Sequence, residues 1–302
     1  MAAIIQTIET PKRWRAQDTS GNNNHGQIYS GRGLEFDGVT DYLKPVDGNI
    51  DASNAGASWS RGTSGDGYYV TNATGRVVPL KVTIAFWINT NQVGTTKQLQ
   101  DQYGAEMDIE LLSSGALYVA YLNDNYGVDA GNDHPAFTGS TILEKNTWYR
   151  VVVIYNMQEG STPIEIYING VKETGTFNGE LGATGNRAYK RTNIDDNYYI
   201  GTYGLGVRDH FDGMLSDWQI WLGNWTADDA AFDYANPEQL ALNRGGTSLT
   251  NSNLKIHYPM NDGHRGQQSY VLDASNTGLG DELLTNGDFS DASVPATWNG
   301  SA

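Results

Sequence analysis

Residues 146–171 constrain the fold more than any other stretch of the sequence. A β-rich run at 148–155 is followed by a run at 164–168 in which isoleucine occupies every second position. Alternation with a period of two is typical of a strand with one buried and one solvent-facing side. The polar loop between the runs predicts an antiparallel hairpin, and Asn169-Gly170 predicts a tight turn after it. We therefore expect this hairpin to lie in the middle of an all-β sandwich.

The other strand candidates are short and separated by turn residues. They are β-rich or alternating runs at 34–43 (two short strands meeting at Asp37-Gly38), 82–89, 105–112, 117–122, 198–201 and 214–222, and a loop is expected at 123–141. Thr226 has the character of a helix N-cap and acidic residues follow it, which predicts one short helix near 226–235. The predicted fold is all-β: a two-sheet antiparallel jelly-roll sandwich with this helix and a C-terminal appendage.

Composition and charge narrow the function classes. The 302 residues include no cysteine, so the chain has neither disulfides nor thiolate metal sites. The net charge of −16 disfavours a nucleic-acid partner, because phosphate binding requires clustered Lys and Arg. It suits a divalent cation or a basic partner, although a solvated acidic surface is the simpler explanation. We expect no membrane insertion, since no run reaches ~20 apolar residues, and cytoplasmic synthesis, since no signal peptide is recognisable.

The order of the motifs resembles a known family. They are DTSGNNNHG (18–26), LEFDGVTDYL (34–43), VTIAFWIN (82–89), NTWYRVVVIYN (146–156), IEIYINGV (164–171), YYIGTYGLG (198–206) and FDGMLSDWQIW (211–221). In this order they resemble the laminin-G-like, concanavalin A-type jelly roll over residues 18–235. The resemblance implies two curved sheets, a concave face that often binds glycans in relatives, and frequently a bound calcium ion.

The expected domain organisation follows from this resemblance. Residues 1–17 form an N-terminal arm and 18–240 the jelly roll. Within 241–280, two segments resemble the strand and loop that normally open such a domain, so we expect this appendage to fold back on the sandwich, a residual second copy being the alternative. Residues 281–302 resemble the start of a second carbohydrate-binding β module that is incomplete, which implies either a natural chain continuing beyond Ala302 or a truncated copy.

A calcium site is the first candidate for chemistry. Hard cations take six to eight oxygen ligands, mostly carboxylates and carbonyls of loops. The resemblance assigns this role to Asp18, Asn22, Asp37 and Asp217, although the family's last-strand motif has an aspartate where this sequence has Ser216. The alternative is that these side chains hydrogen-bond their own turns. No other cofactor is expected, since neither paired histidines nor a glycine-rich phosphate loop is present.

A catalytic carboxylate row is the second candidate. Period two places Glu106, Asp108 and Glu110 on one face of a strand. The pattern resembles the Glu-x-Asp-x-Glu signature of family-16 glycoside hydrolases, in which the first Glu is the nucleophile, the Asp orients it and the last Glu is the acid/base. Against this, three carboxylates on a wet sheet face are common in an acidic protein. We therefore expect no enzyme activity and keep a retaining β-glucanase as the minority alternative.

Aromatic side chains are the third candidate, since they can stack on sugars. The candidates for stacking are Tyr118, Tyr126, Tyr167, Trp218 and Trp221. Packing in the core is the default for aromatic residues in strands. The sequence therefore does not select individual glycan-binding residues, although the side of the hairpin that holds Glu165, Tyr167 and Asn169 is expected to face solvent as a contact surface.

These features together resemble the structural proteins of tailed bacteriophages. The leading hypothesis is a non-enzymatic virion protein of a fibre, tail or capsid decoration, made in the host cytoplasm. Its expected partners are other virion proteins, further copies of itself (a trimer) and host surface glycans. The alternatives are a carbohydrate-binding module of a polysaccharide-acting protein and the family-16-like hydrolase.

Overall fold

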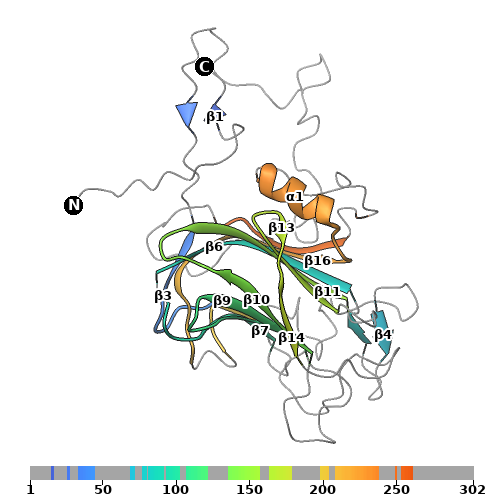
Figure 1. The fold of residues 1–302 in the computed structure, drawn as a ribbon, viewed down its shortest axis with the longest axis horizontal. Helices are drawn as coiled ribbons and strands as arrows, with labels where there is room; N and C mark the ends of the chain where they lie inside the picture. Colours follow the sequence, from blue (N-terminus) through green and yellow to red (C-terminus); the bar gives the residue numbers. More distant parts are fainter. Residues whose placement is uncertain are drawn as a thin grey trace, which may run out of the picture.

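The structure is a computed structural model. It describes residues 15–16, 26–27, 33–44, 69–71, 77–79, 81–91, 93–102, 107–121, 135–156, 163–178, 198–203, 208–237, 249 and 253–260. The described part consists of two larger antiparallel sheets stacked face to face, one short helix and two small sheets (Figure 1). The predicted all-β, two-sheet sandwich is confirmed.

A seven-stranded sheet forms one layer, with the order β13-β12-β11-β6-β16-β17 and β3 also paired with β16. Its strands are β3 (Leu34–Asp37), β6 (Lys81–Thr90), β11 (Trp148–Asn156), β12 (Ile164–Ile168), β13 (Val171–Lys172), β16 (Asp212–Leu222) and β17 (Leu254–Tyr258). The long strand β16 pairs with β3 along its first half and with β17 along its second half, and on its other side it pairs with β6. This arrangement places the segment 254–258 at an edge of the sandwich.

A six-stranded sheet forms the second layer, with the order β14-β10-β9-β8-β7-β15. Its strands are β7 (Lys97–Gln102), β8 (Asp108–Leu111), β9 (Ala116–Ala120), β10 (Ala136–Ile142), β14 (Gly175–Asn178) and β15 (Tyr198–Ile200). Two small sheets pair β1 (Arg15–Ala16) with β2 (Gly26–Gln27) and β4 (Tyr69–Thr71) with β5 (Val77–Pro79). The division of the chain into domains stays a prediction.

The predicted central hairpin is confirmed. Strands β11 and β12 pair antiparallel with Val153 opposite Ile166, and β11 pairs with β6 on its other side. Asn169 and Gly170 have φ values of 51° and 76° and connect β12 to β13. Positive φ at both central residues is the geometry of the type I′ turn, which Asn-Gly favours because neither residue strains there.

Two local predictions were wrong. Residues 136–142 are a strand, β10, and not part of a loop. Its sequence AFTGSTI has few large apolar residues to reveal a strand, and the pairing with β9 and β14 defines it instead. In the segment 34–43, β3 ends at Asp37 and the expected second strand is reduced to a single bridge between Leu43 and Ile200.

The main hydrophobic core lies between the two sheets. Phe86 of β6 stacks on Trp218 of β16, with ring centroids 4.4 Å apart, and both side chains are fully buried. The opposite layer contributes alternate residues such as Ile109 and Val119, which are also inaccessible to solvent. Burial on this scale supplies the main stabilisation of the fold.

The helix α1 (Ala227–Ala235) covers the outer side of the seven-stranded sheet (Figure 1). Thr226 is its N-cap, as predicted, and it forms a capping box with Asp229. Between the helix and the sheet, Trp225 and Ala230 of the helix segment pack with Tyr167 of β12 in a second cluster. Tyr167 is only 3% exposed, so the expectation that this side of the hairpin faces solvent was wrong there, because the helix buries it.

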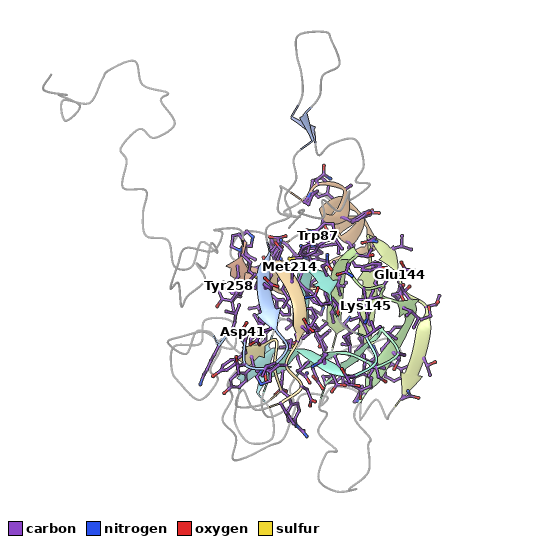
Figure 2. All side chains as sticks on the ribbon, turned by 90° about the vertical axis from the view of Figure 1, so that its left-hand side faces the viewer. Asp41, Trp87, Glu144, Lys145, Met214 and Tyr258 are labelled. Carbon is purple, nitrogen blue, oxygen red and sulfur yellow. The ribbon has the colours of Figure 1, made fainter. Side chains whose placement is uncertain are left out.

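Figure 2 shows Trp87 close to the helix and Asp41 on the far side of the sandwich. The helix therefore closes one outer face and leaves the six-stranded sheet to form the other. Among the described residues, no helix has the length and apolar character required to cross a membrane.

Candidate functional site

The outer side of the six-stranded sheet carries a row of polar and aromatic side chains. Glu110 of β8 lies opposite Tyr118 of β9 on one side and opposite Gln98 of β7 on the other. Ile109 and Leu111 point to the core, so the alternation of β8 directs Asp108 and Glu110 to this outer side. The Tyr155 hydroxyl, which reaches across from β11, donates a hydrogen bond of 3.0 Å to the Asp108 carbonyl and fixes β8 from behind.

A β-bulge in β7 brings a further carboxylate to the row. The register of β7 against β8 shifts between Gln98 and Gln100, so that Asp101 lies opposite Asp108. Without the bulge, strict alternation would place Asp101 on the core side. Gln100 instead takes the inward position, where it is fully buried and donates a hydrogen bond of 3.0 Å to the Met107 carbonyl.

The second row ends in an aromatic residue at the edge of the sheet. Tyr199 of β15 lies opposite Asp101, on the same outer side as Asp108. At the other end of this row, Ala120 of β9 lies opposite Asp108. The outer side therefore has carboxylates in its middle strands and tyrosines on either side of them.

The carboxylates on this side destabilise one another's charged forms. Burial raises the pKa of Asp108 well above its usual value, and the charges of Glu110 and Asp101 add to the effect. Burial likewise raises the pKa of Glu110, with further contributions from Asp209 and Asp101, while Arg208 opposes them. Burial and the neighbouring Asp108 and Glu110 raise the pKa of Tyr118 to about 12. Gln98 donates a side-chain hydrogen bond to the Asp108 carboxylate and so holds it in place.

Of the three predicted catalytic residues, Asp108 and Glu110 lie on one face as expected. Met107, between them and Glu106 in the sequence, is fully buried in the core. Glu106 lies outside the described residues. The raised pKa of Glu110 is a property that a general acid requires, but the nucleophile of the predicted pair is not described.

Asp37, a predicted calcium ligand, uses its carboxylate within its own turn. Its Oδ1 accepts hydrogen bonds from the backbone N–H groups of Thr40 at 2.8 Å, Val39 at 2.9 Å and Asp41 at 3.0 Å. These bonds hold the pKa of Asp37 well below its usual value, because they stabilise the charged form.

Asp217, the second described calcium candidate, belongs to an ion network on the opposite face. Its carboxylate lies 3.0 Å from Nη1 of Arg150 and 2.8 Å from Nε2 of His257. A bulge in β16 next to Asp217, which has a φ of 50°, turns it toward Arg150. Arg150 also forms two hydrogen bonds with Asp233 of α1, at 2.6 and 3.1 Å, so the network connects the helix to the sheet.

The structure does not bring the described calcium candidates together. Asp37 lies at the end of β3 and Asp217 in the ion network beneath the helix. Asp18 and Asn22 lie outside the described residues, and within those residues no group of three or more acidic or histidine side chains is placed to hold a metal ion. The calcium site stays a prediction.

The aromatic candidates fall into distinct environments. Trp218 and Trp221 are fully buried and Tyr167 is nearly so, which removes them as sugar-stacking residues. Tyr126 lies outside the described residues. Tyr118 is partly exposed and lies beside the carboxylates of the outer side. Sequence reasoning missed Asp101 and Tyr199, because the bulge and the edge pairing that place them have no local sequence signal.

Comparison with known proteins defines the family. Residues 62–231 match the family model described as the concanavalin A-like lectin/glucanases superfamily, the Laminin_G_3 family. The chain belongs to this superfamily. No curated protein matches the sequence. In this superfamily chain, the outer side of the six-stranded sheet is the described face that the helix leaves uncovered.

Solved structures resemble the chain only distantly. A "putative carbohydrate binding protein" from Bacteroides ovatus is 15% identical with a TM-score of 0.46, and the match covers 84% of this chain and 60% of that one. A heptameric SAP-like pentraxin from Limulus polyphemus is 16% identical with a TM-score of 0.36, covering 51% and 70%. A Trypanosoma rangeli sialidase is 12% identical with a TM-score of 0.39, covering 69% and 28%. The chain thus spans under two thirds of the Bacteroides protein, and likenesses at this level carry no argument about ligands.

Proposed function

We propose that this superfamily member is a non-enzymatic glycan-binding protein whose binding surface is the outer side of the six-stranded sheet. The observation that carries the proposal is the partly exposed Tyr118 opposite Glu110 and close to Asp108. An aromatic ring offers an apolar surface for a sugar ring, and carboxylate oxygens accept hydrogen bonds from sugar hydroxyls. Family membership supports the same ligand class, since the superfamily is named for lectins and glucanases.

The cost of keeping these carboxylates also supports the proposal. Asp108 and Glu110 have raised pKa values, so the fold is less stable at neutral pH than it would be with neutral groups there. Groups that are costly to the fold and lie together on one surface are candidates for ligand binding. On the other outer face the described helix covers the sheet, Arg150 pairs with Asp217 and Asp233, and Lys172 pairs with Glu165.

A glycan array followed by titration of the best ligand tests the proposal. Tyr118→Ala is expected to weaken binding roughly tenfold or more, since ~1.4 kcal/mol of lost contact is a tenfold change in Kd. Glu110→Gln is expected to weaken it as well. The matched controls are Tyr234→Ala on the helix and Glu165→Gln on β12, which lie on the opposite face and leave affinity unchanged. Absence of binding to every glycan on the array, or equal losses in the controls, would overturn the proposal.

The second candidate is a retaining β-glucanase. Two observations favour an enzyme: the pKa of Glu110 is raised, and Glu110 lies two residues from Asp108 on the same face of β8. A reducing-sugar assay over a panel of β-glucans decides between the two. Release of reducing sugar by the wild type that disappears in Glu106→Gln supports the enzyme. Absence of reducing-sugar release from every β-glucan supports the binding protein.

We further propose that the protein acts as part of a bacteriophage particle, as a fibre, tail or capsid-decoration protein assembled with other virion proteins and as an oligomer. The order of sequence motifs and the acidic, cysteine-free composition support this setting. Mass spectrometry of purified virions tests it, because a virion component is found there and a free module is not.

Thermal unfolding with and without a chelator tests the predicted calcium ion. If the ion is bound, removing it with a chelator is expected to lower the Tm.

A further inference from the structure

The Asn169-Gly170 turn between β12 and β13 is held on two sides. Toward the sheet, Asn169 bonds to both backbone groups of Arg150: its N–H donates to the Arg150 carbonyl at 2.8 Å, and its side-chain Oδ1 accepts from the Arg150 N–H at 2.9 Å. Toward the helix, Gly170 lies against α1 (Figure 1), where a Cβ atom on it would come 3.0 Å from Cα of Ala231 and 3.2 Å from Cβ of Tyr234. The turn is therefore packed between β11 and the helix.

Asn-Gly is also a dipeptide prone to spontaneous deamidation, because glycine leaves its own nitrogen unhindered. The Gly170 nitrogen attacks Cγ of Asn169, the bond from Cγ to the side-chain nitrogen breaks, and ammonia leaves with the proton of the Gly170 N–H. Water then opens the five-membered ring at the side-chain carbonyl, which gives aspartate, or at the main-chain carbonyl, which gives isoaspartate. Water is thus the only co-reactant that the reaction requires.

The folded turn blocks this reaction by its geometry. Asn169 has a φ of 51°, the left-handed conformation of a type I′ turn, in which the following nitrogen lies on the far side of the Cα–C bond from Cβ. Ring closure therefore requires about half a turn of rotation about that bond. Such a rotation moves Gly170 from its place against α1 and breaks the bonds of Asn169 to Arg150. The attack on Cγ thus requires that the turn first separate from its neighbours.

We propose that Asn169 is a deamidation site whose reaction is controlled by the contact of the turn with α1, and that its isoaspartyl product prevents the turn from closing again. Isoaspartate adds one atom to the main chain between Asn169 and Gly170, and a two-residue turn has no place for it. Because Gly170 packs on α1, the change is expected to weaken the attachment of the helix. The site lies on the face opposite the proposed glycan surface and does not depend on that function.

Peptide mapping by mass spectrometry at mildly alkaline pH tests the control of the reaction. Asn169 in the folded protein is expected to react at least about a hundredfold more slowly than in urea, because the reaction proceeds only through the open fraction. Arg150→Met removes the ion pair with Asp233 of α1 and is expected to raise the folded-state rate about tenfold or more. Thr226→Ala, which weakens only the helix cap, raises it by a smaller factor. The matched control is Lys172→Met in β13, which leaves the rate unchanged.

Protein deamidated in urea and then refolded tests the consequence. The isoaspartyl form is expected to have a lower Tm than the unmodified protein. Asn169→Asp reproduces the aspartyl product, keeps an acceptor for the Arg150 N–H and is expected to have nearly the wild-type Tm. Asn169→Gly removes the site and keeps a type I′ turn, so the same treatment is expected to leave its Tm unchanged. This variant separates the effect from deamidation at the other Asn-Gly pairs, at 178, 286 and 299.

Each part of the proposal can fail separately. Equal rates at Asn169 in the folded protein and in urea would overturn the protection by the turn. A rate that changes in neither Arg150→Met nor Thr226→Ala would overturn the role of α1. An isoaspartyl form with the Tm of the unmodified protein, or an equal loss of Tm in treated Asn169→Gly, would overturn the proposed consequence of the modification.

Discussion

Both outer faces of the sandwich hold buried or partly buried carboxylates, but these have different neighbours. Under the helix, Asp233 and Asp217 contact Arg150, whose side chain is 1% exposed and forms ion pairs with both. On the six-stranded sheet, the largest effects on Asp108 after burial come from the negative charges of Glu110 and Asp101. The carboxylates under the helix are therefore paired with a cation, whereas those of the six-stranded sheet repel one another.

The difference between the two faces suggests different roles for their carboxylates. Burial raises the pKa of Asp233, but the charge and hydrogen bonds of Arg150 act against that rise, and the result is a connection between helix and sheet. Asp108 and Glu110, on the other face, form no ion pair that connects two elements of the fold within the described residues. Their raised pKa values make the fold less stable at neutral pH. Natural chains accept such local conflicts mainly where a ligand is bound.

Removal of the matched cation has the largest expected effect on stability. Arg150→Met leaves Asp233 buried without its partner, which is expected to lower the free energy of unfolding by about 3–5 kcal/mol at neutral pH. Chemical denaturation measures it. Without Arg150, the pKa of Asp233 in the folded protein rises further, so the loss is expected to shrink as the pH falls and the carboxyl becomes protonated. A loss below 1 kcal/mol would show that the network is not what connects α1 to the sheet.

The opposite result is expected on the other face. Asp108→Asn removes a charge that burial and like charges disfavour, so it is expected to raise the free energy of unfolding at pH 7. Because the pKa is raised in the folded state, the gain is largest at high pH and disappears as the pH falls through the folded pKa toward 3.8. Urea denaturation at several pH values measures the gain.

Asp37 provides the control for this measurement. Its pKa is lowered in the folded state, so it contributes stability above pH 3.8 that is lost as the pH falls through the folded pKa. Asp37→Asn is therefore expected to lower the Tm at pH 7. If Asp37→Asn and Asp108→Asn both destabilised the protein, the charge of Asp108 would not be unfavourable for folding as we expect.

A smaller loss tests how much the helix contributes to its face. Thr226→Ala removes the N-cap hydroxyl, which accepts from the Asp229 N–H at 3.3 Å and donates to the Asp229 carboxylate at 2.8 Å. The expected loss is about 1 kcal/mol, with glycan binding unchanged because the helix covers the other sheet. Calorimetry and a binding titration on the same variant measure both quantities, and weaker glycan binding would place part of the ligand site near α1.

Much of the fold was predictable because the responsible residues act locally. The alternation in 164–168, the Asn169-Gly170 turn and the Thr226 N-cap each depend on neighbours a few positions away. Contacts over long sequence distances were not predictable. Tyr167 alternates as a solvent-facing residue would, yet a helix some 60 residues later buries it. Arg150 and Asp233, 83 positions apart, likewise have no local signal.

The candidate site was predictable only in part for the same reason. Period two places Asp108 and Glu110 together from sequence alone. Asp101 joins them through the bulge in β7, which reverses the side that alternation predicts. Tyr199 lies beside Asp101 through the pairing of β15 with β7. Each of these non-local pairings determines a position on the outer side that local alternation did not predict.

The smallest expected effect concerns an ion pair at the surface of the seven-stranded sheet. Nζ of Lys172 lies 2.7 Å from Oε1 of Glu165, with the two side chains 52% and 25% exposed. Lys172→Met is expected to change the free energy of unfolding by less than ~0.5 kcal/mol, because solvent screens the pair and the Tyr167 hydroxyl still donates to Glu165 at 2.9 Å. Urea denaturation of Lys172→Met and Arg150→Met side by side measures the contrast. If the two losses were similar, burial would not be what makes the Arg150 ion network important for the stability of the fold.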